Sequence, residues 1–192
     1  MRPAVQRRLS CGPVMGFADY QPEESRRGLS TAISVREALP EELTACARLI
    51  VSRAGGDVEE RRSRLQADLE NPESYVAAAV SGTEVVGYGG VIHHELSPEH
   101  PPSTAPTGYY LIGLIVAPGW RRHGIGELLT RDRMRWTADR ADTIWYFANI
   151  ANLAIQDLHQ SLGFEEITRD FTFPGAPLQP GTAVLLRARL VG

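Results

Sequence analysis

The chain has 192 residues, a formal net charge of −3 and 43% hydrophobic residues. This length predicts one domain, and the composition excludes collagen-like chains and wholly disordered chains. A pI near 6.0 and the lack of any apolar run of about 18 residues give no reason to expect a nucleic-acid or membrane partner.

Residues 1–31 mix Pro, Gly, Ser, Arg and Glu without periodicity. This predicts a flexible N-terminal extension, with Met15 as an alternative start, ahead of a single domain at 32–192. No continuous apolar core follows the first arginines, so the extension does not resemble a secretory signal. The two cysteines, Cys11 and Cys46, have no metal-ligand spacing. We therefore expect a cytoplasmic protein without a metal site.

Apolar periodicity and turn residues divide the domain into helices and strands. Its first half predicts a strand, two helices and three strands, at 33–35, 40–50, 57–70, 75–80, 85–93 and 109–116. Its second half predicts a helix, a strand, a helix and two closing strands, at 124–140, 143–148, 153–162, 165–173 and 182–189. This order predicts a mixed α/β sheet with helices on both faces.

The segment that follows the apolar strand 109–116 carries the chemical information. It reads Arg121-Arg122-His123-Gly124-Ile125-Gly126-Glu127 and opens an amphipathic helix. The first turn of a helix has free N–H groups and a partial positive charge, so it binds anions. The two glycines lack the Cβ atoms that would block a phosphate, and the arginines and histidine add positive charge. The segment therefore predicts a diphosphate-binding loop.

Two familiar diphosphate loops do not fit this segment. A dinucleotide fingerprint, G-x-G-x-x-G, fails because Leu129 occupies its third glycine position. A nucleoside-triphosphate loop requires a lysine, and all 20 basic residues of the chain are arginine. The remaining pattern, [RQ]-x-x-G-x-[GA], resembles the acyl-CoA loop of the GNAT superfamily of N-acetyltransferases. A Gly-rich turn with exposed arginines is the structural alternative.

A second segment, 152–164, is similar to the helix and turn N-x-x-A-x-x-L-Y-x-x-L-G-F of the same family. Ile155 stands where alanine is usual, and His159 stands where tyrosine is usual. Together the two segments support a resemblance that covers about residues 33–189. The resemblance implies a GNAT-like, mostly antiparallel sheet of six to seven strands within the α/β class, with helices on both faces, and often a homodimer.

The resemblance also implies a function and a cosubstrate. We expect an acetyl-CoA-dependent N-acetyltransferase that moves an acetyl group to a primary amine by direct attack on the thioester. The implied CoA-binding residues lie on the apolar strand, on the loop and at the start of the 153–162 helix: Leu114, Ile115, Val116, Arg121, Arg122, His123, Gly124, Ile125, Gly126, Glu127 and Asn152. At the strand, backbone amides would pair with the pantetheine arm, since an exposed strand edge accepts an extended ligand.

Proton transfer needs an acid for the departing thiolate and a base for the amine. His159 is the candidate general acid, because an imidazolium with a pKa of about 6.5 is a stronger acid than a phenol at about 10. The alternative is a helix-face histidine that bonds to water. The strand 109–116 carries no carboxylate, so the base stays open among a water chain, an already deprotonated substrate and five side chains: Tyr109, Tyr110, His93, His94 and Glu95. Of these, Tyr110 is a weak catalytic candidate.

The acceptor pocket is expected to be rimmed by 95–108, by Trp145-Tyr146-Phe147 and by 171–181. Aromatic side chains there favour an apolar or ring-bearing amine, and no acidic cluster indicates a polycation. We expect a small-molecule amine, such as an antibiotic-like compound or an amino-acid derivative. The alternatives are a protein N-terminus or lysine as acceptor, a non-catalytic acyl-CoA sensor or interaction module, and, weakest, an arginine-driven nucleic-acid binder.

Overall fold

The computed structural model describes residues 32–176, 178–179 and 181–190, so the extension predicted at 1–31 lies outside the described residues. Seven strands form one sheet in the order β1-β2-β3-β4-β5-β7-β6, which confirms the predicted mixed, mostly antiparallel sheet. Among the strands of the described residues, β4 and β5 are the one parallel pair. The strands are β1 Ile33–Glu37, β2 Tyr75–Ser81, β3 Glu84–His94, β4 Gly108–Val116, β5 Thr143–Asn149, β6 Glu165–Thr168 and β7 Ala183–Arg189.

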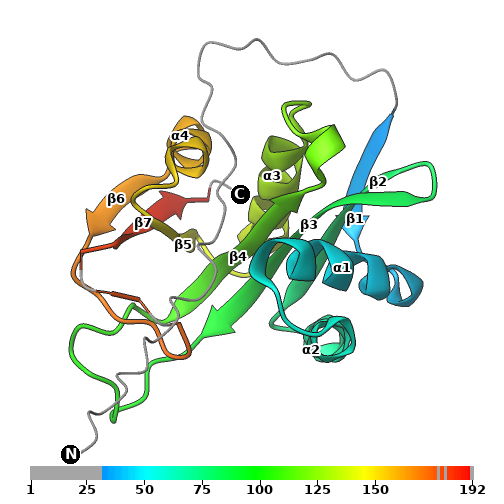
Figure 1. Cartoon of the computed structure of the whole chain (residues 1–192). Helices are drawn as coiled ribbons and strands as arrows, with labels where there is room; N and C mark the ends of the chain where they lie inside the picture. Colours follow the sequence, from blue (N-terminus) through cyan, green and yellow to red (C-terminus); the bar gives the residue numbers. More distant parts are fainter. Residues whose placement is uncertain (1–31, 177, 180, 191–192) are drawn as a thin grey trace, which may run out of the picture.

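Helices cover both faces of the sheet, as predicted (Figure 1). On one face lie α1 (Leu43–Ala54) and α2 (Val58–Glu70), and on the other lie α3 (Ile125–Ala138) and α4 (Leu153–Ser161). Two short 3-10 turns precede α1 and α3, at Pro40–Glu42 and Pro118–Trp120. The predicted N-cap Asp57 accepts a hydrogen bond from the Glu60 backbone N–H at 2.9 Å, which supplies one of the acceptors that a helix start lacks.

The strand predicted at 165–173 is shorter than expected, because β6 ends at Thr168. A bulge interrupts its pairing with β7 between Glu166 and Thr168. Beyond it the Thr168 hydroxyl accepts a hydrogen bond from the Asp170 N–H at 3.0 Å, which turns the chain. Thr172 then makes an isolated bridge to Thr104. A local side-chain bond therefore ends the strand.

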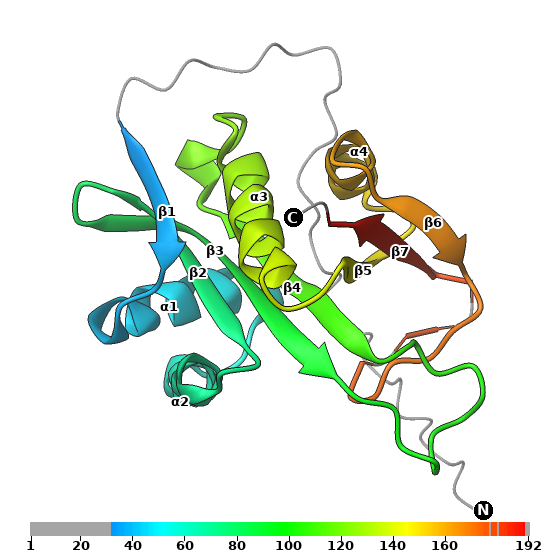
Figure 2. The ribbon, with the colours of Figure 1, turned by 180° about the vertical axis from the view of Figure 1, so that it is seen from behind.

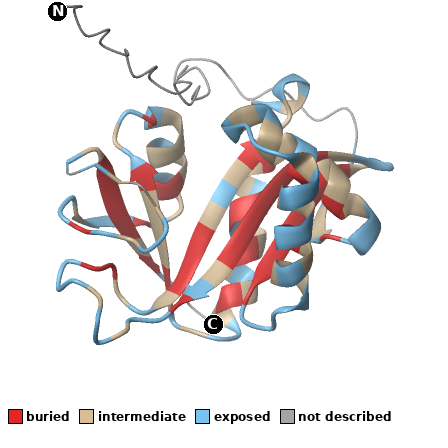
Figure 3. Ribbon diagram, turned by 60° about the horizontal axis from the view of Figure 1, so that its bottom comes forward, coloured by how far each residue is buried: buried red, intermediate tan, exposed pale blue. Residues whose placement is uncertain are grey.

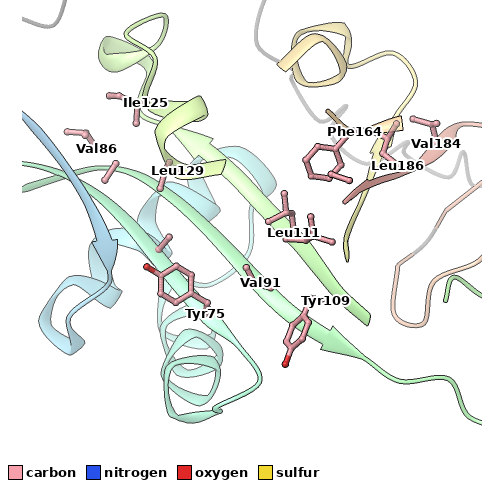
Figure 4. Packing of buried hydrophobic residues seen from close by; sticks show 14 residues of the cluster. Tyr75, Val86, Val91, Tyr109, Leu111, Ile125, Leu129, Phe164, Val184 and Leu186 are labelled. Atoms are coloured by element: carbon pink, nitrogen blue, oxygen red, sulfur yellow. The ribbon is translucent and has the colours of Figure 1, made fainter. Parts of the chain in front are cut away.

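The core follows from the alternation of side chains along the strands. On the α3 face, Leu111, Ile125 and Leu129 are buried in one cluster that continues to Phe164 and Leu186 near α4 (Figure 4). On the opposite face a second cluster packs beneath α1 and α2. The central strands are mostly buried, and the outer sides of the helices are exposed (Figure 3). This arrangement matches the near-continuous apolar sequence of β4.

β4 and β5 separate part-way along their length (Figure 2). They pair only from Tyr109 to Leu111 on β4. A bulge in the β3–β4 ladder then places Gly113 at φ +45°, a conformation that favours glycine. Because the bulge adds one residue, side chains beyond it change face, so that Leu114 joins the α3 cluster. From Ile112 onward β4 has no strand partner on its β5 side among the described residues.

Candidate active site

A cleft of about 760 Å³ opens where β4 and β5 separate. Its floor comes from residues 111–115 of β4 and 146–149 of β5, and its walls come from α1, α2 and the residues Ala176, Leu178, Gln179, Thr182 and Ala183. Of the predicted CoA-binding residues, Leu114, Ile115 and Asn152 line this cleft. Val116 continues the same strand without lining it. The predicted rim segment 95–108 contributes no lining residue.

The loop at 121–127 lies beyond the end of β4 and is open to solvent at its centre. Gly124 has φ +77°, and a Cβ built there would meet nothing within 4 Å. The backbone N–H groups of Gly124, Ile125 and Gly126 have no hydrogen-bond acceptor among the described residues. Arg122 is the single described non-glycine residue with positive φ, at 66°. Together these features form a concave, N–H-lined surface that fits a diphosphate.

The remaining loop side chains have distinct environments. Arg121 is exposed, and its Nε donates to the Val116 carbonyl at 3.4 Å. His123 lies against Trp120, with ring centroids 6.4 Å apart. Glu127 pairs with Arg131 at 2.9 Å, one turn along α3. The loop therefore presents Arg121 and backbone N–H groups outward while the Glu127 carboxylate is neutralised along the helix.

Gly126, at the start of α3, lies close to side chains of β4 and α4. A Cβ built there would lie 3.5 Å from Leu158 and 3.7 Å from Leu114. These are ordinary contact distances, and both partners flank the route from the loop to the cleft. A Cβ would therefore fit between these neighbours, and packing against β4 and α4 does not itself require a glycine at this position.

The comparison with protein families agrees with this geometry. The sequence model for the Acetyltransferase (GNAT) family matches residues 36–164, more than half of the chain. The chain belongs to this family. No curated protein sequence matches it.

Solved structures of GNAT proteins share the fold. A GNAT-family acetyltransferase from Streptococcus pneumoniae is 16% identical with a TM-score of 0.61, over 84% of this chain and 100% of that chain. A ribosomal-protein-alanine N-acetyltransferase from Brucella melitensis is 19% identical with a TM-score of 0.62, over 82% and 99%. An aminoglycoside 6'-acetyltransferase type Ii is 21% identical with a TM-score of 0.60, over 83% and 98%. At these identities the likeness concerns the fold alone.

In this GNAT chain His159 is fully buried on α4, whereas the alternative to a general acid was a histidine on the helix face bonded to water. Its ring stacks on Tyr146 at 4.0 Å between centroids, with an interplanar angle of 3°. Its Nδ1 lies 2.8 Å from the Ile155 carbonyl oxygen, which can only accept, so Nδ1 carries the proton. Burial lowers the pKa of His159 to about 3. The ring is therefore neutral at physiological pH, and its unprotonated Nε2 has no partner among the described residues.

This neutral burial predicts an acid-sensitive fold. Below about pH 6.5 the unfolded chain binds a proton at His159 that the folded chain excludes until about pH 3, so stability decreases as the pH falls. Between pH 6.5 and 5 we expect a loss of about 2 kcal/mol from this group. Urea unfolding of wild type and His159→Phe at both pH values measures the difference. The exposed His93→Phe is the control, and an unchanged pH dependence in His159→Phe would contradict the assignment.

The other proton-transfer candidates lie outside the cleft. Tyr110 is buried, and its hydroxyl donates to the Pro106 carbonyl at 2.6 Å. Tyr109 donates to a Glu73 carboxylate. His94 is bonded to the Ala105 carbonyl at 3.2 Å, and burial lowers its pKa. Tyr109, Tyr110 and His94 do not line the cleft, and neither do His93 and Glu95.

Two residues that the sequence analysis did not assign do line the cleft. Tyr146 lies opposite Leu111 in the last β4–β5 pair, and its hydroxyl has no hydrogen-bond partner among the described residues. Burial raises the pKa of Tyr146, and the guanidinium groups of Arg133 and Arg53 oppose that shift. Asp68 on α2 is the single carboxylate among the described lining residues. Burial raises the pKa of Asp68 above its ordinary value.

Strand and helix periodicity carried a signal for both. Alternation along β5 places Tyr146 on the same face as Ile144 and Ala148, and Asp68 shares a helix face with Leu65. The sequence did not show where β4 and β5 separate, so it did not show that these two side chains would line a cleft.

No helix in the described part of the chain is long and apolar enough to cross a membrane. Within the same residues, no group of three or more His, Cys, Asp or Glu side chains is arranged to hold a metal ion. Cys46 is buried, and burial raises the pKa of its thiol to about 12. The cytoplasmic location and the homodimer stay predictions.

Proposed function

We propose that this GNAT protein is an acetyl-CoA-dependent N-acetyltransferase acting on the primary amine of a small molecule. The observation that carries the proposal is the open first turn of α3 around Gly124, placed at the end of the unpaired edge of β4. A diphosphate at this turn leaves its attached arm beside β4. From there the arm reaches the point where β4 and β5 separate.

Three parts of the chain would hold acetyl-CoA. The N–H groups of 124–126 and the Arg121 guanidinium would bind its diphosphate, through charge-assisted hydrogen bonds. The free edge of β4 at Ile112–Val116 would pair with the amides of its arm. Asn152 lines the cleft with a side chain that has no partner among the described residues, and it would bind the same amides. Acetyl-CoA supplies the activated acyl group.

The residues around the separation point would then carry the proton and charge transfers. A backbone N–H of β4 stabilises negative charge on the acyl oxygen, an effect of about 2.7–4 kcal/mol per donor in other acyl transferases. Tyr146 donates a proton to the departing thiolate, and His159 fixes the orientation of the Tyr146 ring through stacking. Asp68 accepts a proton from the amine. In this proposal the general acid is Tyr146, and no longer His159, the candidate from the sequence.

Replacing Tyr146 with phenylalanine tests the acid role. It retains the ring that stacks on His159 and removes the proton, so kcat is expected to fall about 100-fold, in the range of general acid catalysis. The KM for acetyl-CoA is expected to stay unchanged. Steady-state thiol release measures both constants. Tyr75→Phe, which removes a hydroxyl bound to Asp132, is the control.

The alternative assignment is distinguishable with the same assay. A Tyr146→Phe enzyme with full kcat, combined with a His159→Phe enzyme that loses it, would return the acid role to His159.

The proposed activity itself is tested by free-thiol release from acetyl-CoA with a panel of small primary amines. Thiol release that depends on an amine, with mass spectrometry of the acetylated product, is the expected result. Acetyl-CoA that raises the melting temperature while no amine yields thiol would overturn the proposal. That outcome would favour the acyl-CoA sensor.

A further inference from the structure

One wall of the cleft comes from a single face of α2. Arg61, Arg64, Leu65 and Asp68 all line it and stand at positions i, i+3, i+4 and i+7 of the helix. At 1.5 Å per residue, this face extends for about 10 Å. The wall belongs to the sheet face opposite α3, and none of the loop residues 121–127 lines the cleft with it. It is therefore separate from the diphosphate loop.

The wall is more cationic than the net charge of the chain suggests. Arg53 of α1 lines the same cleft, so three arginines and one carboxylate-bearing residue are among its lining residues. Two of the three are already engaged: Arg53 donates to the Leu114 carbonyl at 2.8 Å, and Arg64 pairs with Glu60 at 2.6 Å. The guanidinium of the third, Arg61, has neither a hydrogen bond nor an ion pair within the described residues.

Arg61 is held in place although it has no partner. Its side chain is half-buried, and its Nε is fully buried without an acceptor. The guanidinium packs beside Gly56, where a Cβ would lie 3.7 Å from Nε and Nη2. A desolvated donor without an acceptor is costly, and a guanidinium is suited to a carboxylate or phosphate because of its planar fork of donors. The position therefore favours an anionic ligand.

Asp68 lies two helical turns further along the same wall. Its carboxylate has no hydrogen bond or ion pair within the described part of the chain. Burial without a cation is unfavourable for a carboxylate, and an ammonium group would supply the missing charge. The wall therefore presents an anion site at Arg61 and a cation site at Asp68, with the apolar side chains of Leu65 and Tyr88 beside them.

We propose that the acceptor is a short peptide with free ends, whose carboxylate binds Arg61 while its amine faces Asp68 near the end of the acetyl-CoA arm. An extended chain spans about 3.3–3.6 Å per residue, so three residues cover the distance of about 10 Å between the two sites. This inference rests on the proposed acetyl transfer and narrows its acceptor class. Simple apolar amines lack the anionic group, and polyamines would meet three arginines. A carboxylate-bearing acceptor satisfies both unpaired charges of the wall at once.

The test compares tripeptides with the corresponding tripeptide amides, which keep the amine and the side chains and remove the negative charge of the carboxylate. Thiol release from saturating acetyl-CoA gives kcat/KM for each member of a pair. For the best acid we expect kcat/KM to exceed that of its amide by at least about tenfold, the value of a charge-assisted pair. Amides that react as well as their acids would overturn the inference while leaving the acetyltransferase function intact.

Arg61→Gln locates the anion site. It is expected to lower kcat/KM for the acid about tenfold while leaving the amide reaction unchanged. Arg62→Gln is the matched control, because Arg62 pairs with Glu59 at 2.7 Å and does not line the cleft. A rise in the KM for acetyl-CoA in Arg61→Gln, without a change in the acid-to-amide ratio, would assign Arg61 to a CoA phosphate and overturn the inference.

A binding measurement separates this inference from the proposed activity. N-acetyl tripeptides and their amides are titrated calorimetrically into the CoA-saturated protein. Tighter binding of the acids, lost in Arg61→Gln and kept in Arg62→Gln, supports the anion site even if no amine turns over. Equal binding of acids and amides, or no binding of either, overturns it.

Discussion

Replacing Gly124 with valine is expected to raise the KM for acetyl-CoA by at least about tenfold, since it removes charge-assisted hydrogen bonds of roughly 1.5–3 kcal/mol each. Gly124 has φ +77°, which costs a residue with a Cβ roughly 1–2 kcal/mol, and more when the side chain is β-branched. The valine side chain would also project into the open space in front of the 124–126 N–H groups. Initial-rate measurements over a range of acetyl-CoA concentrations give the change.

Two variants separate the access effect from the backbone effect. Gly119→Ala lies in the preceding turn, where a Cβ meets nothing within 4 Å and φ is not positive, so the KM for acetyl-CoA is expected to stay within about twofold of wild type, the ordinary range for a surface change. Gly124→Asn accepts the left-handed conformation with less strain but still adds a side chain. An unchanged KM in both Gly124 variants would exclude this turn as the diphosphate site.

The loop was predictable because its signals are local. A strand end, two glycines and a helix start follow one another within one short segment, and each has a fixed conformational meaning. The same holds for the Asp57 cap, whose partner lies three residues away. The order of helices and strands then left few topologies open, and the family resemblance selected one of them.

The environment of His159 was not predictable from its own helix. Its burial comes from Tyr146 on β5 and from Phe164, whose ring centroid lies 4.9 Å away. The sequence suggested an imidazolium because it supplied only an ordinary pKa. Packing against two aromatic rings makes the imidazole neutral instead of positively charged. That packing depends on how α4 lies on the sheet.

Asp68 and Arg61 were missed for a related reason. A charge on an amphipathic helix ordinarily faces solvent, and α2 carries nine charged or polar residues among its exposed positions and its cleft-facing positions alike. The separation of β4 from β5 decides which of these charges line a cleft. The sequence contained that separation only as Gly113, one of several glycines on β3 and β4.

The burial of Arg133 on α3 likewise cannot be predicted from the sequence of its own helix, and it leads to a second prediction with a large expected effect. Arg133 is 1% exposed, which is rare for a charged side chain. Its guanidinium donates to the carbonyls of Leu129, Gly90 and Ile112 at 3.0–3.2 Å, and to the Thr130 hydroxyl at 3.2 Å. Burial lowers the pKa of Arg133 to about 10, so it stays charged. It thereby fixes β4 beside Gly113, where the two strands separate.

Gly89→Ala is expected to destabilise the fold by about 1–3 kcal/mol, the usual cost of overpacking a core. A Cβ on Gly89 would lie 2.8 Å from the Arg133 Cζ, and the guanidinium has little freedom to move because four acceptors hold it. In an Arg133→Met background the same substitution meets a flexible, uncharged chain and is expected to cost little. A double-mutant cycle of urea unfolding measures the coupling directly. Equal costs of Gly89→Ala in both backgrounds would show that Gly89 is not required by Arg133, and the glycine would then need another explanation.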